Sequence, residues 1–150
     1  MTHSYQETKP LTVALPLGLF GFETIRAGGI SANRHFCKHN IPIFTLHSED
    51  TLFTLDILET NFHYYGEDIR HFINQLYPKA ETDVTIFIPL CIQRTSSGAR
   101  IMGNLRCPLI LNNQTLCTHQ LVLSASNLTM HGHLFTVHEP TLIQPDMYDA

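Results

Sequence analysis

Residues 100–123, RIMGNLRCPLILNNQTLCTHQLVL, contain the pattern that decides the expected fold. Apolar side chains occupy every second position through much of the first half, and a period of two places them on one face of a β-strand. The polar run 112–115 follows, and asparagine is favoured in tight turns because it tolerates the left-handed backbone region. Residues 116–123 can then return antiparallel, so the stretch predicts a β-hairpin.

Pro108 lies within the first strand of this hairpin. Proline has no backbone N–H to donate, so its strand is expected at a sheet edge or with a bulge at that point. Asn104 and Arg106 occupy the strand face opposite the apolar residues. We therefore predict that Asn104, Arg106 and Pro108 belong to a partner-binding surface. An ordinary bulged surface strand remains the alternative.

Further β segments and one helix are expected around the hairpin. Apolar alternation or β-rich composition predicts strands over 11–15, 41–46, 52–58 and 84–92. Apolar residues at helical spacing predict the one helix over 67–77. Because strands and helices do not alternate as in βαβ units, the expected class is mainly β. We expect a small antiparallel β-barrel or sandwich with one packed α-helix.

Length and composition indicate one folded domain. The chain has 150 residues, of which 43% are hydrophobic and 15% are charged, a balance typical of globular proteins. We expect a flexible lead-in over 1–10, the β domain over 11–134 and a loose tail over 135–150. Residues 16–23 are expected to form a structured loop anchored by its aromatic side chains. Residues 26–40 are expected to form an exposed excursion.

Charge and hydropathy disfavour several classes of partner. The formal net charge is −4 with histidine neutral, whereas sequence-independent nucleic-acid binding needs clustered lysine and arginine. No run of 18 apolar residues and no secretory signal is visible, so we expect a cytoplasmic protein with reduced thiols. Cys107 and Cys117 could face each other across the hairpin, which leaves a disulfide between them as the alternative.

The sequence contains few candidates for catalysis. His131 and His133 would share one face of a strand, as two ligands of a small metal-dependent, cupin-like β-barrel enzyme would. No segment supplies three ligands at the usual spacing, and no nucleophile elbow, phosphate loop or dinucleotide fingerprint occurs. The run 47–50, His-Ser-Glu-Asp, gathers triad residue types in one loop without triad geometry. We therefore favour a binding module with no cofactor over a metal enzyme.

Three segments together carry a resemblance to a known family. They are LPLGLFGFE (15–23), IPIFTLHSEDTLFTLDI (41–57), and NLRCPLILN (104–112) followed by HQLVL (119–123). In order and spacing they resemble the flagellar assembly factor FliW family, which shows a G-x-x-GF-E-like opening, an L-Q-S-x-D-D-like loop and N-L-x-A-P-I-x-I-N followed by Q-V-V-L. The residues that fit are Gly18, Gly21, Phe22, Glu23, Leu46, Ser48, Asp50, Asn104, Leu105, Pro108, Asn112, Gln120 and Leu123. His47 and Cys107 depart from the pattern, where the family usually has glutamine and alanine.

This resemblance implies a cytoplasmic, β-barrel-like regulator that is not an enzyme, and we expect a monomer. Members of the family bind flagellin before export, and they also bind the translational repressor CsrA. When flagellin accumulates it occupies FliW, and the released CsrA represses flagellin translation. Flagellin and CsrA are therefore the predicted partners. We predict that His47, Glu49 and Asp50 contact a partner, because carboxylates in this loop can meet basic residues on a protein such as CsrA.

Overall fold

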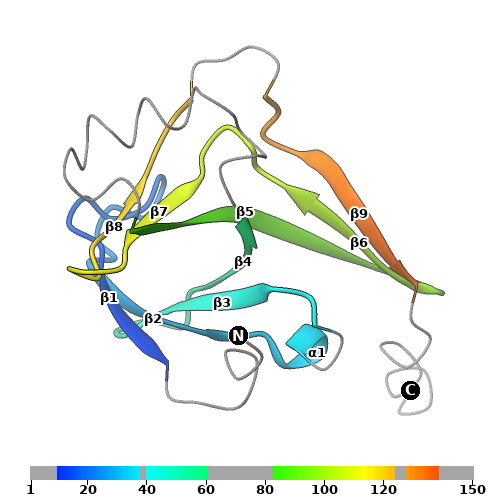
Figure 1. Ribbon diagram of the computed structural model, residues 1–150, viewed down its shortest axis with the longest axis horizontal. Coiled ribbons are helices and arrows are strands. Elements are labelled where there is room, and N and C mark those ends of the chain that lie inside the picture. Colours follow the sequence, from blue (N-terminus) through cyan, green and yellow to red (C-terminus); the bar gives the residue numbers. More distant parts are fainter. Residues whose placement is uncertain (1–9, 38–39, 61–82, 124–127, 139–150) are drawn as a thin grey trace.

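The fold is described by a computed structural model for residues 10–37, 40–60, 83–123 and 128–138. These segments contain nine strands and one short helix (Figure 1). The elements are β1 (Leu11–Ala14), β2 (Ala27–Ala32), α1 (Arg34–Cys37), β3 (Ile43–Ser48), β4 (Thr54–Thr60), β5 (Val84–Thr95), β6 (Gly98–Gly103), β7 (Leu109–Asn112), β8 (Thr118–Gln120) and β9 (Gly132–His138). Within the described segments, no helix has the length and apolar character needed to cross a bilayer.

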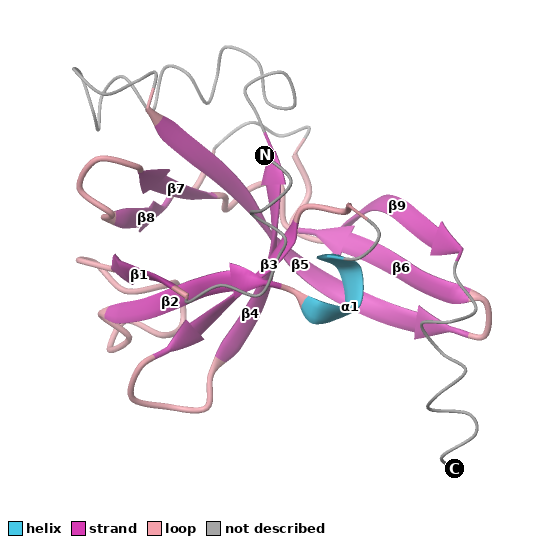
Figure 2. Ribbon diagram, turned by 60° about the horizontal axis from the view of Figure 1, so that its bottom comes forward, coloured by secondary structure: helices cyan, strands magenta, loops and turns pink. Residues whose placement is uncertain are grey.

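The longest strand, β5, connects two parts of a single antiparallel sheet. The strand order is β1-β2-β3-β4-β5-β6-β9, and β7 and β8 branch from β5. The first part of β5 pairs with β4 and β7, and the second part pairs with β6. Strand β5 therefore runs from a curved sheet of β1–β4, β7 and β8 into a three-stranded ribbon with β6 and β9 (Figure 2).

The curved sheet comes close to rolling up on itself. Ala14 at the end of β1 donates a backbone hydrogen bond to the Leu116 carbonyl at 3.0 Å, and it forms an isolated parallel bridge with Cys117. Strand β1 has no continuous ladder with β8, so the sheet is not closed. The expected mainly β, antiparallel class is confirmed, and an open, curved sheet describes the molecule better than a barrel.

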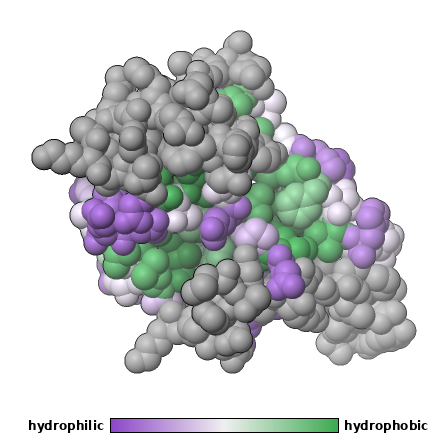
Figure 3. Space-filling view, viewed as in Figure 1, coloured by the Kyte–Doolittle hydropathy of each residue, from purple (hydrophilic) through white to green (hydrophobic). Residues whose placement is uncertain are grey.

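Apolar side chains pack on both sides of β5 and β7. The largest cluster fills the inside of the curved sheet and includes Leu109 and Leu111. Because side chains alternate along a strand, Ile110 lies in a different cluster on the other face of β7. A further cluster joins α1 to the ribbon and includes Phe36, which is fully buried. On the face seen in Figure 1, the surface shows apolar areas separated by polar side chains (Figure 3).

Five residues, 104–108, connect β6 to β7 along one edge of β5. Leu90 and Phe87, which pair with the end of β6 and the start of β7, are separated on β5 by only two residues. Five residues therefore lie opposite two and bulge out of the sheet. The prediction of one continuous strand through this stretch is wrong, because sheet pairing resumes only at Leu109.

Pro108 is buried at the end of this bulge. Its carbonyl accepts a backbone hydrogen bond from Leu121 at 2.9 Å, and its missing N–H costs nothing where no ladder bond is required. A bulge at the proline is thus confirmed. The edge position is wrong, because β7 pairs with β5 on one side and β8 on the other.

The expected excursion over 26–40 is also wrong. Strand β2 lies inside the sheet between β1 and β3, and α1 buries Phe36. The Asn33 side-chain oxygen accepts the His35 N–H at 2.9 Å and caps α1. At Gly28, an added Cβ would lie 2.5 Å from the His47 carbonyl oxygen. The glycine that suggested a loop therefore permits close packing of two strands.

The remaining predictions on hairpins, cysteines, the helix and the chain ends are confirmed in part, wrong in part, or lie outside the described residues. The hairpins β3–β4 and β7–β8 are confirmed. Cys107 and Cys117 are free thiols, so a disulfide between them is wrong. The helix predicted over 67–77 and most of both predicted terminal segments lie outside the described residues. Strand β9 continues to His138, so 135–138 belong to the sheet rather than to a loose tail.

Candidate partner-binding surface

The turn between β3 and β4, residues 49–53, presents two of the predicted partner-binding residues. Glu49 and Asp50 are exposed there. The Ser48 N–H donates to the Phe53 carbonyl at 3.1 Å, and the Ser48 hydroxyl accepts the Asp50 N–H at 3.2 Å. These hydrogen bonds hold the turn in one conformation, so the two carboxylates have a defined position at the tip of the hairpin.

No described residue neutralises either carboxylate. Among the described residues, no cation lies within salt-bridge distance of Glu49 or Asp50. Both remain available to a basic partner. At an exposed position, such charges mainly accelerate association and make binding sensitive to salt.

His47 lies on β3 beside this turn and is half-buried. A Cβ added at Gly29 would lie 3.3 Å from its Cδ2 atom and 3.4 Å from its Nε2 atom, so the imidazole packs over that glycine. His47 and Glu49 line a shallow hollow of about 430 Å³, which is completed by Pro10, Thr12, Gly28, Gly29 and Ser48. The structure thus places His47 on the strand beside the turn that carries Glu49 and Asp50, and His47 and Glu49 share one hollow.

The bulge 104–108 holds the other three predicted residues. The Asn104 side-chain oxygen accepts the backbone N–H groups of Arg106 and Cys107, both at 3.1 Å. The Asn104 N–H donates to the Pro89 carbonyl at 2.8 Å. These hydrogen bonds use the amide oxygen inside the protein. Asn104 is therefore a residue that stabilises the bulge, and its oxygen is not free for a partner.

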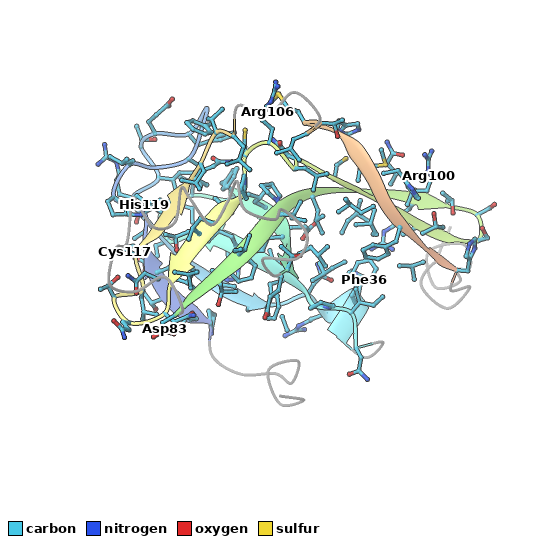
Figure 4. All side chains as sticks on the ribbon, turned by 45° about the horizontal axis from the view of Figure 1, so that its top comes forward. Phe36, Asp83, Arg100, Arg106, Cys117 and His119 are labelled. Carbon is cyan, nitrogen blue, oxygen red and sulfur yellow. The ribbon has the colours of Figure 1, made fainter. Side chains whose placement is uncertain are left out.

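Arg106 differs from Asn104 because part of its side chain is unsatisfied. Its Nε atom is buried and finds no hydrogen-bond partner in the described structure. Its backbone carbonyl accepts the Leu123 N–H at 2.8 Å, which fixes the position of the residue beside β8. Figure 4 labels Arg106 at the top of the view and Phe36 on α1 at its lower right. A buried unpaired N–H is costly, and because this atom is shielded from solvent it offers no direct contact to a partner.

The two predicted groups lie in different places. His47 and Glu49 line a hollow beside Pro10, Thr12 and the glycines of β2, and Asn104 does not line that hollow. Asn104 instead lines a separate hollow of about 120 Å³ with His131 and six other residues. The sequence predicted that all six residues bind partners without predicting whether they share a surface, and the structure divides them between the β3–β4 turn and the bulge.

The alternative hypothesis, a metal site that uses His131 and His133, finds no set of ligands among the described residues. The His133 Nε2 atom lies 2.9 Å from the Thr136 hydroxyl, and His131 is exposed. In the segments that the structure describes, no group of three or more His, Cys, Asp or Glu side chains is placed to hold a metal ion. A catalytic zinc would need at least three protein ligands.

The loop 15–26, between β1 and β2, carries exposed apolar residues that sequence analysis missed as a surface. Its aromatics were expected to anchor it, but Phe20 and Phe22 are exposed, and the loop is anchored instead by its buried aliphatic residues Leu15, Leu19 and Ile25. The Phe22 ring contacts the Phe53 ring with centroids 4.6 Å apart, so this loop touches the 49–53 turn. Only the glycine spacing of the loop could have indicated a tight, outward-facing conformation.

Comparison with known proteins places this fold in context. The family model described as FliW protein matches residues 2–134. A crystal structure of the flagellar assembly factor FliW superposes with a TM-score of 0.63 and 20% sequence identity, covering 83% of this chain and 85% of that chain. Comparison with curated protein sequences finds no match. The structural likeness shows a shared fold.

Proposed function

The chain belongs to the FliW family, and from this membership we propose that it acts in flagellar assembly by binding flagellin and CsrA. The observation that carries the proposal is the match of the family model over residues 2–134, which span all of the described core. The chain would hold either flagellin or CsrA in the cytoplasm. Accumulating flagellin would displace CsrA, and the released CsrA would repress flagellin translation.

The acidic turn supports this proposal because it offers a defined electrostatic contact. Glu49 and Asp50 project from a hydrogen-bonded turn and are not neutralised by described cations. A repressor that binds RNA must carry basic residues, so carboxylates are suitable groups to meet it. Arg106 offers the opposite charge on the separate bulge. Two distinct charged regions are compatible with two partners that differ in charge.

The arrangement of 47–50 favours binding over catalysis. His47 and Ser48 are neighbours on β3, and successive side chains of a strand point to opposite faces. The serine hydroxyl accepts a backbone hydrogen bond from Asp50, and the imidazole packs over Gly29. A nucleophile and its base must lie within hydrogen-bond reach of each other, which this placement prevents.

The test is a set of calorimetric titrations of the purified chain with purified flagellin and purified CsrA, alone and in competition. We expect each partner to bind and flagellin to displace CsrA. Binding of neither protein would contradict the proposal. Binding of both at once, without competition, would contradict the partner switch while leaving an assembly role.

A second comparison tests the acidic turn. Glu49→Gln with Asp50→Asn should weaken CsrA binding more at low salt than at high salt. Gln93→Lys with Ser97→Lys raises the net charge by the same amount at exposed positions of the β5–β6 hairpin. If this control weakens CsrA binding equally, only net charge matters and the turn is not the contact.

A further inference from the structure

The loop 15–26 and the turn 49–53 together form one surface, which we name the loop–turn surface. Its two parts are joined by the ring contact between Phe22 and Phe53. Four apolar side chains on it are exposed: Leu17 by 75%, Phe20 by 53%, Phe22 by 49% and Leu52 by 99%. Single exposed apolar residues are common on proteins, but several on adjoining loops mark an interaction site.

Hydrogen bonds hold the loop 15–26 in a single shape. The Arg26 side chain donates through Nε to the Glu23 carbonyl at 2.8 Å and through Nη1 to the Pro16 carbonyl at 2.9 Å. The Phe20 N–H donates to the Gln120 side-chain oxygen at 2.9 Å, which attaches the loop to β8. Because the loop is ordered before any partner arrives, binding through it loses little conformational entropy.

The backbone of the loop directs its large side chains outward. Gly18 and Gly21 adopt positive φ angles of 71° and 82°, which side-chain-bearing residues rarely adopt. Leu19 and Phe22 exchange backbone hydrogen bonds at 3.2 and 2.8 Å, and of these two side chains only Leu19 is buried in the core. The tight turn between them leaves Phe20 at the tip, so solvent exposure of this ring follows from the fold.

Charge on the same surface indicates what kind of segment it fits. Glu23, Glu49 and Asp50 are exposed around the apolar side chains, and no described cation pairs with them. The Arg26 guanidinium is the one nearby positive group of the loop, and it is occupied by two backbone carbonyls. An apolar surface with unpaired carboxylates complements a segment in which apolar residues alternate with lysine or arginine.

From these observations we infer that the loop–turn surface docks a basic, amphipathic segment of a protein partner. Leu17, Phe20 and Phe22 supply the apolar contacts, and the three carboxylates select for basic residues beside them. The inference deepens the proposed function and rests on it for the identity of the partner. Anionic lipid headgroups would be repelled by the carboxylates, and so would the same surface on a second copy.

The first experiment uses a probe that does not depend on the partner's identity. It measures binding of the full chain to a synthetic helical peptide of leucine and lysine, and to the same peptide with glutamate in place of lysine. We expect binding of the lysine peptide only. Leu17→Ser with Phe20→Ser should weaken it at least tenfold, because truncating central apolar anchors typically has this effect.

Matched variants separate docking from folding. Met130→Ser removes an apolar side chain that is 57% exposed, close to the exposure of Phe20, from outside the loop–turn surface. It should leave peptide binding unchanged. Neither variant should alter the melting temperature, because the affected side chains are already solvated. Equal losses in both variants, or equal binding of the two peptides, would overturn the inference.

The second experiment repeats the variants with flagellin and CsrA. We expect Leu17→Ser with Phe20→Ser to weaken at least one of them tenfold or more, while Met130→Ser weakens neither. If the native chain binds neither protein yet binds the lysine peptide through this surface, the proposed function fails and the docking surface stands. If both flagellin and CsrA bind the double variant as they bind the native chain, the docking surface is wrong and the proposed function stands.

Two further measurements exclude other occupants. Vesicles of phosphatidylcholine, with and without phosphatidylglycerol, should not retain the chain. Sedimentation should give the same mass for the native chain and the double variant. Vesicle binding or self-association that depends on Leu17 and Phe20 would assign the surface to a membrane or to a second copy, and would overturn the inference.

Discussion

The side-chain oxygen of Asn104 accepts the backbone N–H of Cys107 at 3.1 Å, and this contact closes the bulge between β6 and β7. The same oxygen accepts the Arg106 N–H at 3.1 Å. The bulge therefore depends on one side chain for two of its backbone donors. A residue predicted to contact a partner is thus committed to holding the sheet connection in shape.

Asn104→Ala should lower the free energy of unfolding by about 1–3 kcal/mol, because both N–H groups lose their acceptor. Asn104→Asp keeps an oxygen at the same position and should lose less. Denaturant unfolding of the three proteins measures the difference. Unchanged stability of Asn104→Ala, together with weaker binding of flagellin or CsrA, would mean that the residue contacts a partner directly.

Gly18→Ala and Gly21→Ala form a matched pair in the loop 15–26. Both glycines have positive φ angles, so either substitution should cost roughly 1 kcal/mol in backbone strain. At Gly18, the new Cβ would also lie 2.6 Å from the Glu23 Cα atom, whereas at Gly21 no atom lies within 4 Å. Gly18→Ala should therefore lower the melting temperature more than Gly21→Ala. Equal shifts would show that the loop relaxes freely.

Glu59 should make the protein less stable as the pH rises from acid to neutral. Glu59 lines a hollow of about 270 Å³ together with residues that include Phe44, Phe87 and Leu111, and desolvation raises the pKa of its carboxyl above the ordinary value of 4.5. With a raised pKa in the folded state, the stabilising contribution of Glu59 is present below pH 4.5 and is lost as the pH rises through the folded pKa.

Glu59→Gln removes this dependence. We compare the free energy of unfolding of the variant with that of the native chain at two pH values. The difference should favour the variant more at about pH 7 than at about pH 4, because an amide carries no charge to desolvate. Thermal unfolding of both proteins across this range measures the difference. A stability difference that does not change with pH would show that the carboxyl titrates in the folded protein as it does in the unfolded chain.

His119 should make the protein less stable as the pH falls, which is the opposite of the effect of Glu59. The residue lies on β8 opposite Ile110, and burial lowers the pKa of its imidazole below 6.5. A lowered pKa stabilises the fold above pH 6.5, and this contribution is lost as the pH falls through the folded pKa. His119→Gln should therefore lose less stability on acidification than the native chain. Identical acid sensitivity of the two proteins would contradict this assignment.

The cysteines should differ in reactivity. Cys91 is exposed, whereas Cys107 is buried with 6% of its surface accessible. Cys117 is only partly buried, so the test uses a Cys37→Ser, Cys117→Ser background. In it, a thiol reagent should modify Cys91 rapidly and Cys107 only on unfolding, since accessibility limits the reaction. Adding Cys91→Ser should abolish the rapid phase. Rapid modification of Cys107 in the native protein would mean that the bulge opens readily.

Local sequence patterns predicted the hairpins well. Alternation along 84–92 and the polar turn at 112–115 depend on residues that are adjacent in the chain, so the period of two was enough to place β5, β7 and β8. The same reasoning failed at β2, because Gly28 and Gly29 suggest a loop when read locally. The tertiary structure shows why glycine is needed at these two positions. Strand β3 lies beside them, and His47 occupies the space that larger side chains would fill.

The six predicted partner-binding residues illustrate the same limit. Glu49 and Asp50 were placed correctly on an exposed turn, because a polar run between two strands is a local signal. Asn104 was assigned to an outward face by alternation, and alternation does not continue through a bulge in which five residues oppose two. Whether a side chain binds a neighbour or a partner depends on what lies next to it in space.

The sequence by itself determined that the chain forms an antiparallel β fold of the FliW type, because side-chain period, turn residues and motif order are properties of the chain alone. The tertiary structure decided which apolar residues remain outside. Phe20 is exposed because its N–H bonds to Gln120, a hundred residues away, and because Leu19 takes the place in the core. Such pairings depend on which strands meet, and no local pattern encodes them.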